Sequence, residues 1–414
     1  MRTISNLDLK LQLTNEYLRN GGVQKILDPD LLQDIIDFNI HKPETITSRL
    51  NAFMLVIMGS QMQPPFFSED FISEYSSFLQ KSYCFDQYKI DTIEEFDKIY
   101  DEYKNTSEIL YRGQSEAKWR LYSNLQRTWI LNKLHKKENS YEGFLQKLVL
   151  TGQEDYEDKI NEVLKEHNID TINSISVLGF LQHHGCPTPL LDWTYKFQNA
   201  LFFAMDGLTR NNVPREIEDY FSVYHIKQSD MEGGGMRQVM DESLDDFDGQ
   251  YKSELISTFA IDEEQRIEME KHFQGRKSID IDRIFGSGII EYITKIENMM
   301  NFNLSFFSDK DSKKGFIFSL NNSHNILNQK GVFTWNSSSM KPLEVVGNEQ
   351  YFEDVVDGKA DDYRFCNCLN INKNLVGHIS KRLLQDGITR DFIYPTKDID
   401  TRSLFDKIST KANS

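Results

Sequence analysis

The chain has 414 residues, enough for two domains or for one large domain with an appendage. Hydrophobic residues make up 39% and aromatic residues 12%, which excludes a disordered chain of low apolar content. The net charge of -17 argues against general nucleic-acid binding, which normally requires an excess of lysine and arginine.

The cysteine content and the length of the apolar runs indicate the cellular compartment. Four cysteines are too few for a disulfide scaffold and fit a reducing cytoplasm. Cys366 and Cys368 have the wrong spacing for a zinc knuckle, so we expect buried thiols and no metal site. The first ten residues do not resemble a secretory signal. The longest apolar run, 52–58, is far shorter than the roughly 20 residues that cross a bilayer, so we expect a core helix there and no membrane association.

The first 90 residues are predicted to be helical. Asp28 precedes Pro29, which suits the first position of a helix, and apolar residues recur at helical spacing up to Phe38. Pro64 and Pro65 end the next helical stretch. We therefore expect an α+β protein with a helical N-terminal region, 1–90, and a larger mixed α/β domain, 91–407.

The next elements alternate between helix and strand. Thr92 and Glu95 form a capping box before an apolar stripe that runs from Phe96 to Tyr103, and 109–111 is then predicted to be a strand. Helices are expected at 176–184 and 198–206, each ended by a glycine. Strands are expected at 221–226 and 316–320, with an acidic exposed loop at 230–250 between them.

Arg112 follows the short strand and precedes Gly113, which would let a ligand approach the backbone closely. A guanidinium held in this way can bind a phosphate or a carboxylate through two parallel hydrogen bonds, and Gln114 can add an amide contact. The alternative is a buried ion pair, with Asp192 as the partner.

A second polar segment runs from residue 182 to residue 194. His183 and His184 end a predicted helix and project in different directions, so at most one faces a given site, while the other caps helix carbonyls. Two prolines flank Thr188 and force an extended entry into 190–194. Asp192 lies between Leu191 and Trp193, so we expect it to be partly buried and to need a partner.

These segments resemble the FRG domain family. The family's Phe/Tyr-Arg-Gly signature is similar to Tyr111-Arg112-Gly113-Gln114, and its second signature is similar to the segment from Gln182 to Thr194 followed by 200–204. Two later segments fit as well, 328–334 and 384–395, so the resemblance covers about residues 90–407. Pro189 departs from it, because the family commonly carries arginine there. The family is bacterial and phage-related and is often met near defence or toxin genes.

The resemblance leads to a first hypothesis, an enzyme similar in logic to ADP-ribosyltransferases that uses NAD, as an anti-phage defence or toxin effector. Arg112, His184, Asp192 and Gln329 are the catalytic candidates, with Glu291 as the alternative to Gln329. The candidates for binding the dinucleotide are Tyr111, Gly113, Gln114, His183, Thr188 and Thr194.

The second hypothesis is a non-catalytic sensor or toxin subunit. In it, Arg112, His184 and Asp192 form a network that holds the fold and binds a phage protein or a small nucleotide signal. The N-terminal helical region would then be the surface for a phage or host protein partner.

Overall fold

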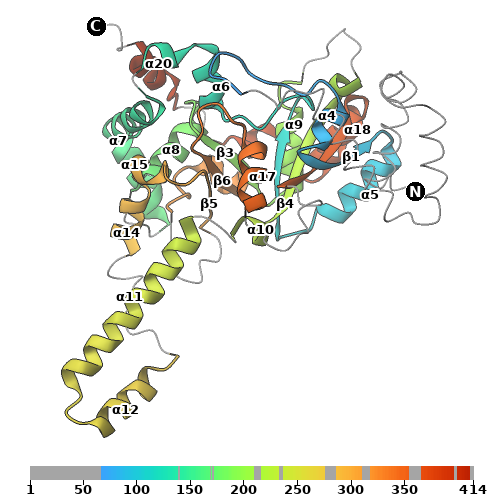
Figure 1. Cartoon of the computed structure of the whole chain (residues 1–414). Coiled ribbons are helices and arrows are strands. Elements are labelled where there is room, and N and C mark those ends of the chain that lie inside the picture. Colours follow the sequence, from blue (N-terminus) through green and yellow to red (C-terminus); the bar gives the residue numbers. More distant parts are fainter. Residues whose placement is uncertain are drawn as a thin grey trace, which may run out of the picture.

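The computed structural model describes residues 67–138, 140–167, 169, 172–208, 216–232, 236–275, 286–309, 318–353, 365–395 and 399–410. These residues form a mixed α/β body around a seven-stranded sheet of order β1-β7-β4-β2-β3-β6-β5 (Figure 1). The helices predicted at 29–38 and 52–58 lie outside the described residues.

The strands are β1 Phe85–Ile90, β2 Ile109–Gln114, β3 Leu190–Thr194, β4 Tyr220–Lys227, β5 Leu304–Phe307, β6 Gly331–Asn336 and β7 Cys366–Asn372. β1 pairs with β7 in parallel, and the other neighbours are antiparallel. The prediction of a helical region up to residue 90 is therefore wrong for 85–90. Phe85, Gln87 and Ile90 are the buried residues of this edge strand, whose ladder partner lies far away in sequence.

The sheet is divided into two halves between β2 and β3. β2 pairs with β4 from Ile109 to Gln114, and β3 pairs with β6 from Leu190 to Thr194. Between β2 and β3 the register holds a single pair, Tyr111 with Thr194. We call the place where this ladder ends the β2–β3 junction.

Three helices cover one face of the β1-β7-β4-β2 half: α5 Ile93–Tyr103, α9 Phe197–Met205 and α18 Val376–Gln385. The predicted capping box of α5 is confirmed, because Thr92 accepts from the Glu95 N–H while Glu95 accepts from the Thr92 N–H. Phe96 and Tyr100 of its apolar stripe are fully buried. The strand predicted at 109–111 and the strand at 221–226 are confirmed as parts of β2 and β4.

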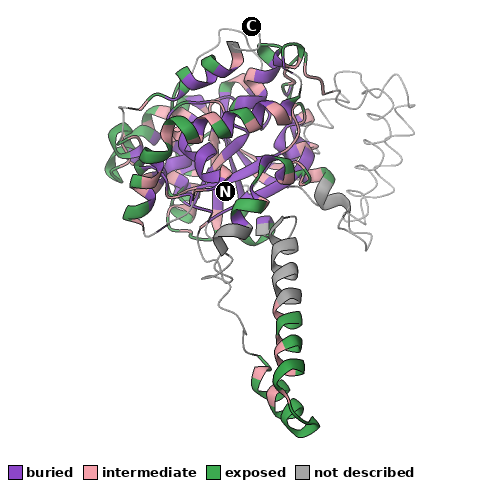
Figure 2. Ribbon diagram, turned by 90° about the vertical axis from the view of Figure 1, so that its left-hand side faces the viewer, coloured by how far each residue is buried: buried purple, intermediate pink, exposed green. Residues whose placement is uncertain are grey.

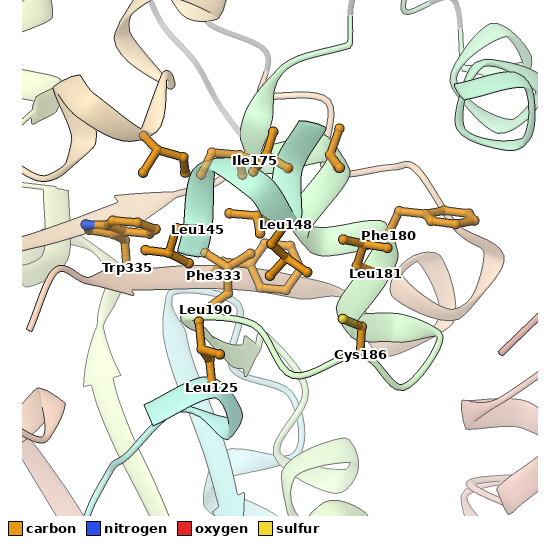
Figure 3. Packing of buried hydrophobic residues seen from close by; sticks show 14 of the residues in the cluster. Leu125, Leu145, Leu148, Ile175, Phe180, Leu181, Cys186, Leu190, Phe333 and Trp335 are labelled. Carbon is orange, nitrogen blue, oxygen red and sulfur yellow. The ribbon is translucent and has the colours of Figure 1, made fainter. Parts of the chain in front are cut away.

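The β3-β6-β5 half is covered by α7 Tyr141–Glu166, α8 Ser174–His183 and α20 Arg402–Thr410. Leu190 of β3 and Phe333 of β6 face this layer, where they meet Leu148 and Leu181 (Figure 3). Leu191 and Trp193 point to the opposite face, toward α17 Leu343–Glu353. The two predicted glycine stops are confirmed: α8 and α9 end just before Gly185 and Gly207, whose φ angles are +99° and +80°.

The remaining short elements are α4 Phe78–Ser82, α6 Asn124–Leu131, η1 Leu134–Lys136, η2 Glu216–Asp219, α14 Gly286–Ile293, α15 Ile296–Met299, α16 His324–Gln329, η4 Lys373–Leu375 and α19 Arg390–Ile393. None of the helices in the described ranges combines the length and the apolar character needed to cross a membrane.

Two predictions on the second half of the chain are wrong. The stretch 230–250 is helical, with α10 Gln228–Glu232 and α11 Met236–Phe259, and α11 projects from the body together with α12 Glu263–Phe273 (Figures 1 and 2). The sequence of α11 contains no proline that would interrupt a helix. Phe318 and Leu320 form no strand, because both backbone N–H groups donate to the carboxylate of Asp309, each at 2.6 Å.

Candidate functional site

Arg112 lies at the β2–β3 junction and reaches from one half of the sheet to the other. Its Nη1 donates to the backbone carbonyl of Asp192 at 2.7 Å. Nε is buried without a hydrogen-bond partner, and no ion pair within the described ranges includes this guanidinium. The alternative prediction, a buried ion pair between Arg112 and Asp192, is therefore not among the ion pairs of the described residues. Burial lowers the pKa of Arg112, and the nearby negative charge of Asp192 partly opposes that effect.

Asp192 is held by a short chain of hydrogen bonds. Gln182 Nε2 donates to Asp192 Oδ1, and Thr188 Oγ1 donates to the amide oxygen of Gln182. Thr188 is fully buried, so it positions Gln182 and cannot contact a ligand. Asp192 and Gln182 stay partly exposed. The carboxylate of Asp192, a residue that is not fully buried, is thus fixed on one oxygen.

The two histidines take different roles from those assigned to them. Burial lowers the pKa of the His183 imidazole, and the negative charge of Asp192 partly opposes that effect. The Nε2 atom of His183 is buried without a hydrogen-bond partner. His184 instead packs its ring on Phe180 at 4.5 Å, and its carbonyl accepts from the Thr401 N–H. Burial lowers the pKa of His184 to about 4. The ring of His184, a catalytic candidate from the sequence, therefore lies against Phe180 near the C-terminal segment, and its catalytic role stays a prediction.

The neighbours of Arg112 on β2 serve the fold. The hydroxyl of the buried Tyr111 shares a hydrogen bond of 2.5 Å with Thr106 Oγ1, and its ring packs against other aromatic rings. A Cβ on Gly113 would lie 1.9 Å from the carbonyl oxygen of Ala200, so this glycine is needed for the close approach of α9 and not for a ligand. Gln114 Nε2 donates to the carbonyl of Arg120 at 3.2 Å and secures the loop after β2.

Thr194 and Gln329, two later candidates, form hydrogen bonds within the fold. Thr194 Oγ1 donates to the Gln329 carbonyl at 2.6 Å and accepts from the Lys196 N–H, which fixes the start of α9. The buried Gln329 side chain donates to the carbonyl of Ile393 at 3.2 Å. A cavity of about 470 Å³ opens beside them, but neither side chain lines it. Glu291 is exposed on α14, whose main described contact is with α15.

Sequence reasoning missed two members of the neighbourhood. Burial and the positive charge of Arg112 both lower the pKa of Arg127 on α6. The Nε atom of Arg127 is also buried without a hydrogen-bond partner. Tyr394 is near Asp192, whose charge adds to burial and to Asp206 in raising the pKa of Tyr394 to about 12. Neither residue belongs to a local motif, and only the fold brings them to the junction.

The Arg112 site, defined by Arg112, Gln182, His183 and Asp192, lies within one stretch of the chain. Residues 107–212 match the family model of the FRG domain. This segment is an FRG domain. Neither the curated proteins nor the solved structures yielded a match to the chain.

The FRG domain contributes β2, α6, α7, α8, β3 and α9. It therefore supplies both strands of the junction and every residue of the Arg112 site, while β4 and β6 complete the sheet from outside the matched segment. A guanidinium with free donors, a carboxylate fixed by an amide and a neutral imidazole can bind an anionic ligand and stabilise positive charge beside it. In the described residues no group of three or more His, Cys, Asp or Glu side chains is arranged to hold a metal ion.

Proposed function

We propose that the FRG domain binds NAD as a substrate and that the chain is an enzyme of the ADP-ribosyltransferase-like or NAD-hydrolysing kind. The observation that carries the proposal is the guanidinium of Arg112, which is partly buried and free of any described carboxylate partner. A partly buried guanidinium that forms no hydrogen bond to a carboxylate can bind an anionic guest, and the diphosphate of a dinucleotide is such a group. The ADP-ribosyltransferase-like character of the fold is part of this proposal.

The remaining residues of the Arg112 site suit the chemistry of the nicotinamide bond. When the glycosidic C–N bond breaks, its electron pair leaves with nicotinamide, and positive charge develops on the ribose. The carboxylate of Asp192, held by Gln182, stabilises that charge electrostatically. In hydrolysis a water oxygen bonds to the ribose carbon and loses one proton, which the unpartnered Nε2 of His183 accepts. Transfer replaces water with another acceptor.

We place this activity in a bacterial anti-phage defence or toxin effector that works in the cytoplasm, where NAD is abundant. The support for that setting is the FRG domain itself. The competing function is a non-catalytic sensor or toxin subunit. It is favoured by the observation that the side chains of Thr188, Thr194 and Gln329 all form hydrogen bonds within the protein.

The test is release of nicotinamide from NAD by the purified full chain, with and without candidate protein acceptors. We expect Arg112→Ala and Asp192→Asn to lower the rate by about 10²-fold or more, as removal of one electrostatic contact to a transition state does. The matched control is Asp206→Asn, which removes an exposed carboxylate paired with Arg390. An inert wild type, folded and supplied with every acceptor, overturns the enzyme in favour of the sensor. Equal activity of wild type and Arg112→Ala excludes the Arg112 site.

A further inference from the structure

Three other buried cations in the described part of the chain have hydrogen-bond or ion-pair partners. The ammonium group of Lys81 donates to three oxygens, those of Ala117, Ser222 and Asn370, at 2.8–2.9 Å. Lys373 and Glu116 form a buried ion pair at 2.8 Å. Arg120, only 2% exposed, is paired with Glu344 at 3.3 Å. Such pairing is expected, because a buried charge without a partner is strongly destabilising.

Arg127 departs from this pattern in the same way as Arg112. Its guanidinium carbon lies over the Trp119 ring, 4.7 Å from the ring centre, a cation–π contact. Its Nε is buried without a partner, and the ion pairs of the described ranges do not include it. Glu74 is the carboxylate whose charge reaches Arg127, but Glu74 is ion-paired with Lys118 at 3.5 Å.

Two contacts hold Arg127 beside the β2–β3 junction. The Leu125 N–H, in the first turn of α6, donates to the Thr188 carbonyl just before β3 at 3.1 Å. The loop from β2 to α6 is secured by the bond from Gln114 to the Arg120 carbonyl. α6 is thereby tied to both strands of the junction. Burial and the positive charge of Arg112 lower the pKa of Arg127 to about 10, so the Arg127 guanidinium is charged at neutral pH.

We infer that Arg112 and Arg127 together form a site for two linked phosphates, with one guanidinium for each phosphate. The inference rests on the proposed function, since it identifies the part of the substrate that this site recognises. Two neighbouring guanidinium groups repel each other when the site is empty, and a diphosphate offers each of them a planar pair of oxygens. A single carboxylate or phosphate satisfies one fork and leaves the other unpaired, so we expect a preference for the doubly phosphorylated group.

Inorganic pyrophosphate and orthophosphate are the probes, titrated calorimetrically into the full chain at low salt. We expect pyrophosphate to bind at least tenfold more tightly than orthophosphate. Arg127→Met and Arg112→Met should each weaken pyrophosphate binding by about tenfold or more, which corresponds to about 1.4 kcal/mol. Arg127→Lys keeps the charge but loses the fork, so its affinity should fall between wild type and Arg127→Met. The matched control is Arg266→Gln on α12, an exposed arginine paired with Glu263 and Glu270, which should bind as wild type does.

The inference is overturned if wild type binds no pyrophosphate, if both anions bind equally, or if Arg127→Met binds as wild type does. Circular dichroism and a melting curve show whether each variant is folded, and Arg127→Lys replaces Arg127→Met if the latter is not. The proposed function fails separately. Pyrophosphate binding through both arginines without nicotinamide release refutes the enzyme alone, whereas nicotinamide release that is unaffected in Arg127→Met refutes the paired site alone.

Discussion

Arg120 and Arg127 come from one stretch of chain and experience opposite environments. Both stack on aromatic rings, Arg120 at 4.0 Å from the centre of Tyr75 and Arg127 at 4.7 Å from that of Trp119. Burial disfavours the charge of Arg120, but Tyr75 and Glu344 outweigh it and raise the pKa of that guanidinium. At Arg127, burial and the charge of Arg112 outweigh the opposing effect of Glu74 and lower the pKa.

The difference separates a region that holds the fold from the region where we propose that a ligand binds. Glu344 is completely buried and accepts hydrogen bonds from the Tyr75 hydroxyl, from Arg120 and from the Leu121 N–H. It thereby joins α17 to the loop between β2 and α6. At the β2–β3 junction the Nε atoms of Arg112 and Arg127 are buried without a hydrogen-bond partner, which lowers stability.

The largest effect is expected at the paired region. Glu344→Gln leaves Arg120 buried without a counter-charge, so the free energy of unfolding should fall by about 3–5 kcal/mol, measured by urea denaturation. The matched control is Glu349→Gln on the same helix, whose exposed carboxylate pairs with Lys341. It should change stability by less than about 1 kcal/mol. Similar small losses in both variants would mean that the buried network contributes little.

An intermediate effect tests whether the junction is tightly packed. Gly113→Ala places a Cβ against the backbone of Ala200 and Ala204 in α9, so we expect a loss of about 1–3 kcal/mol or more from overpacking. Gly377→Ala on α18 meets no atom within 4 Å and should be neutral or stabilising by up to about 1 kcal/mol. If Gly113→Ala is tolerated equally well, the junction is loose, and the unpaired donors of Arg112 reflect poor packing instead of a binding site.

The smallest effect has the opposite sign. Arg127→Met keeps an apolar stem on Trp119 and removes an unpaired buried charge, so the melting curve should show a gain of about 0.5–2 kcal/mol. Arg382 is the matched control, because it also lies 4.7 Å from a ring centre, that of Tyr100, but is paired with Asp97 and Asp101. Arg382→Met should give no gain in the free energy of unfolding. A clear loss of stability in Arg127→Met would assign this arginine to the fold.

Local patterns allowed much of the fold to be predicted, and fewer of the site residues. The capping box at Thr92 and the glycine stops at Gly185 and Gly207 depend on residues close in sequence, and the structure has them as predicted. Arg112 was correctly placed beside the segment 182–194, since both signatures lie in the FRG domain. The internal contacts of Gly113, Thr188 and Gln329 could not be predicted, because each has its partner on another element: α9, Gln182 of α8 and Ile393 of α19.

The sequence by itself determined which segments form helices and strands around the FRG signatures and which polar residues they carry, because capping, periodicity and turn chemistry act over a few residues. Only the tertiary structure decided that the sheet ladder stops after the Tyr111–Thr194 pair, that His183 faces Asp192 while His184 turns away, and that Arg127 joins Arg112. The physical reason is that burial and charge pairing depend on groups distant in sequence. A guanidinium becomes a binding group or a fold-holding group according to whether a carboxylate is packed against it.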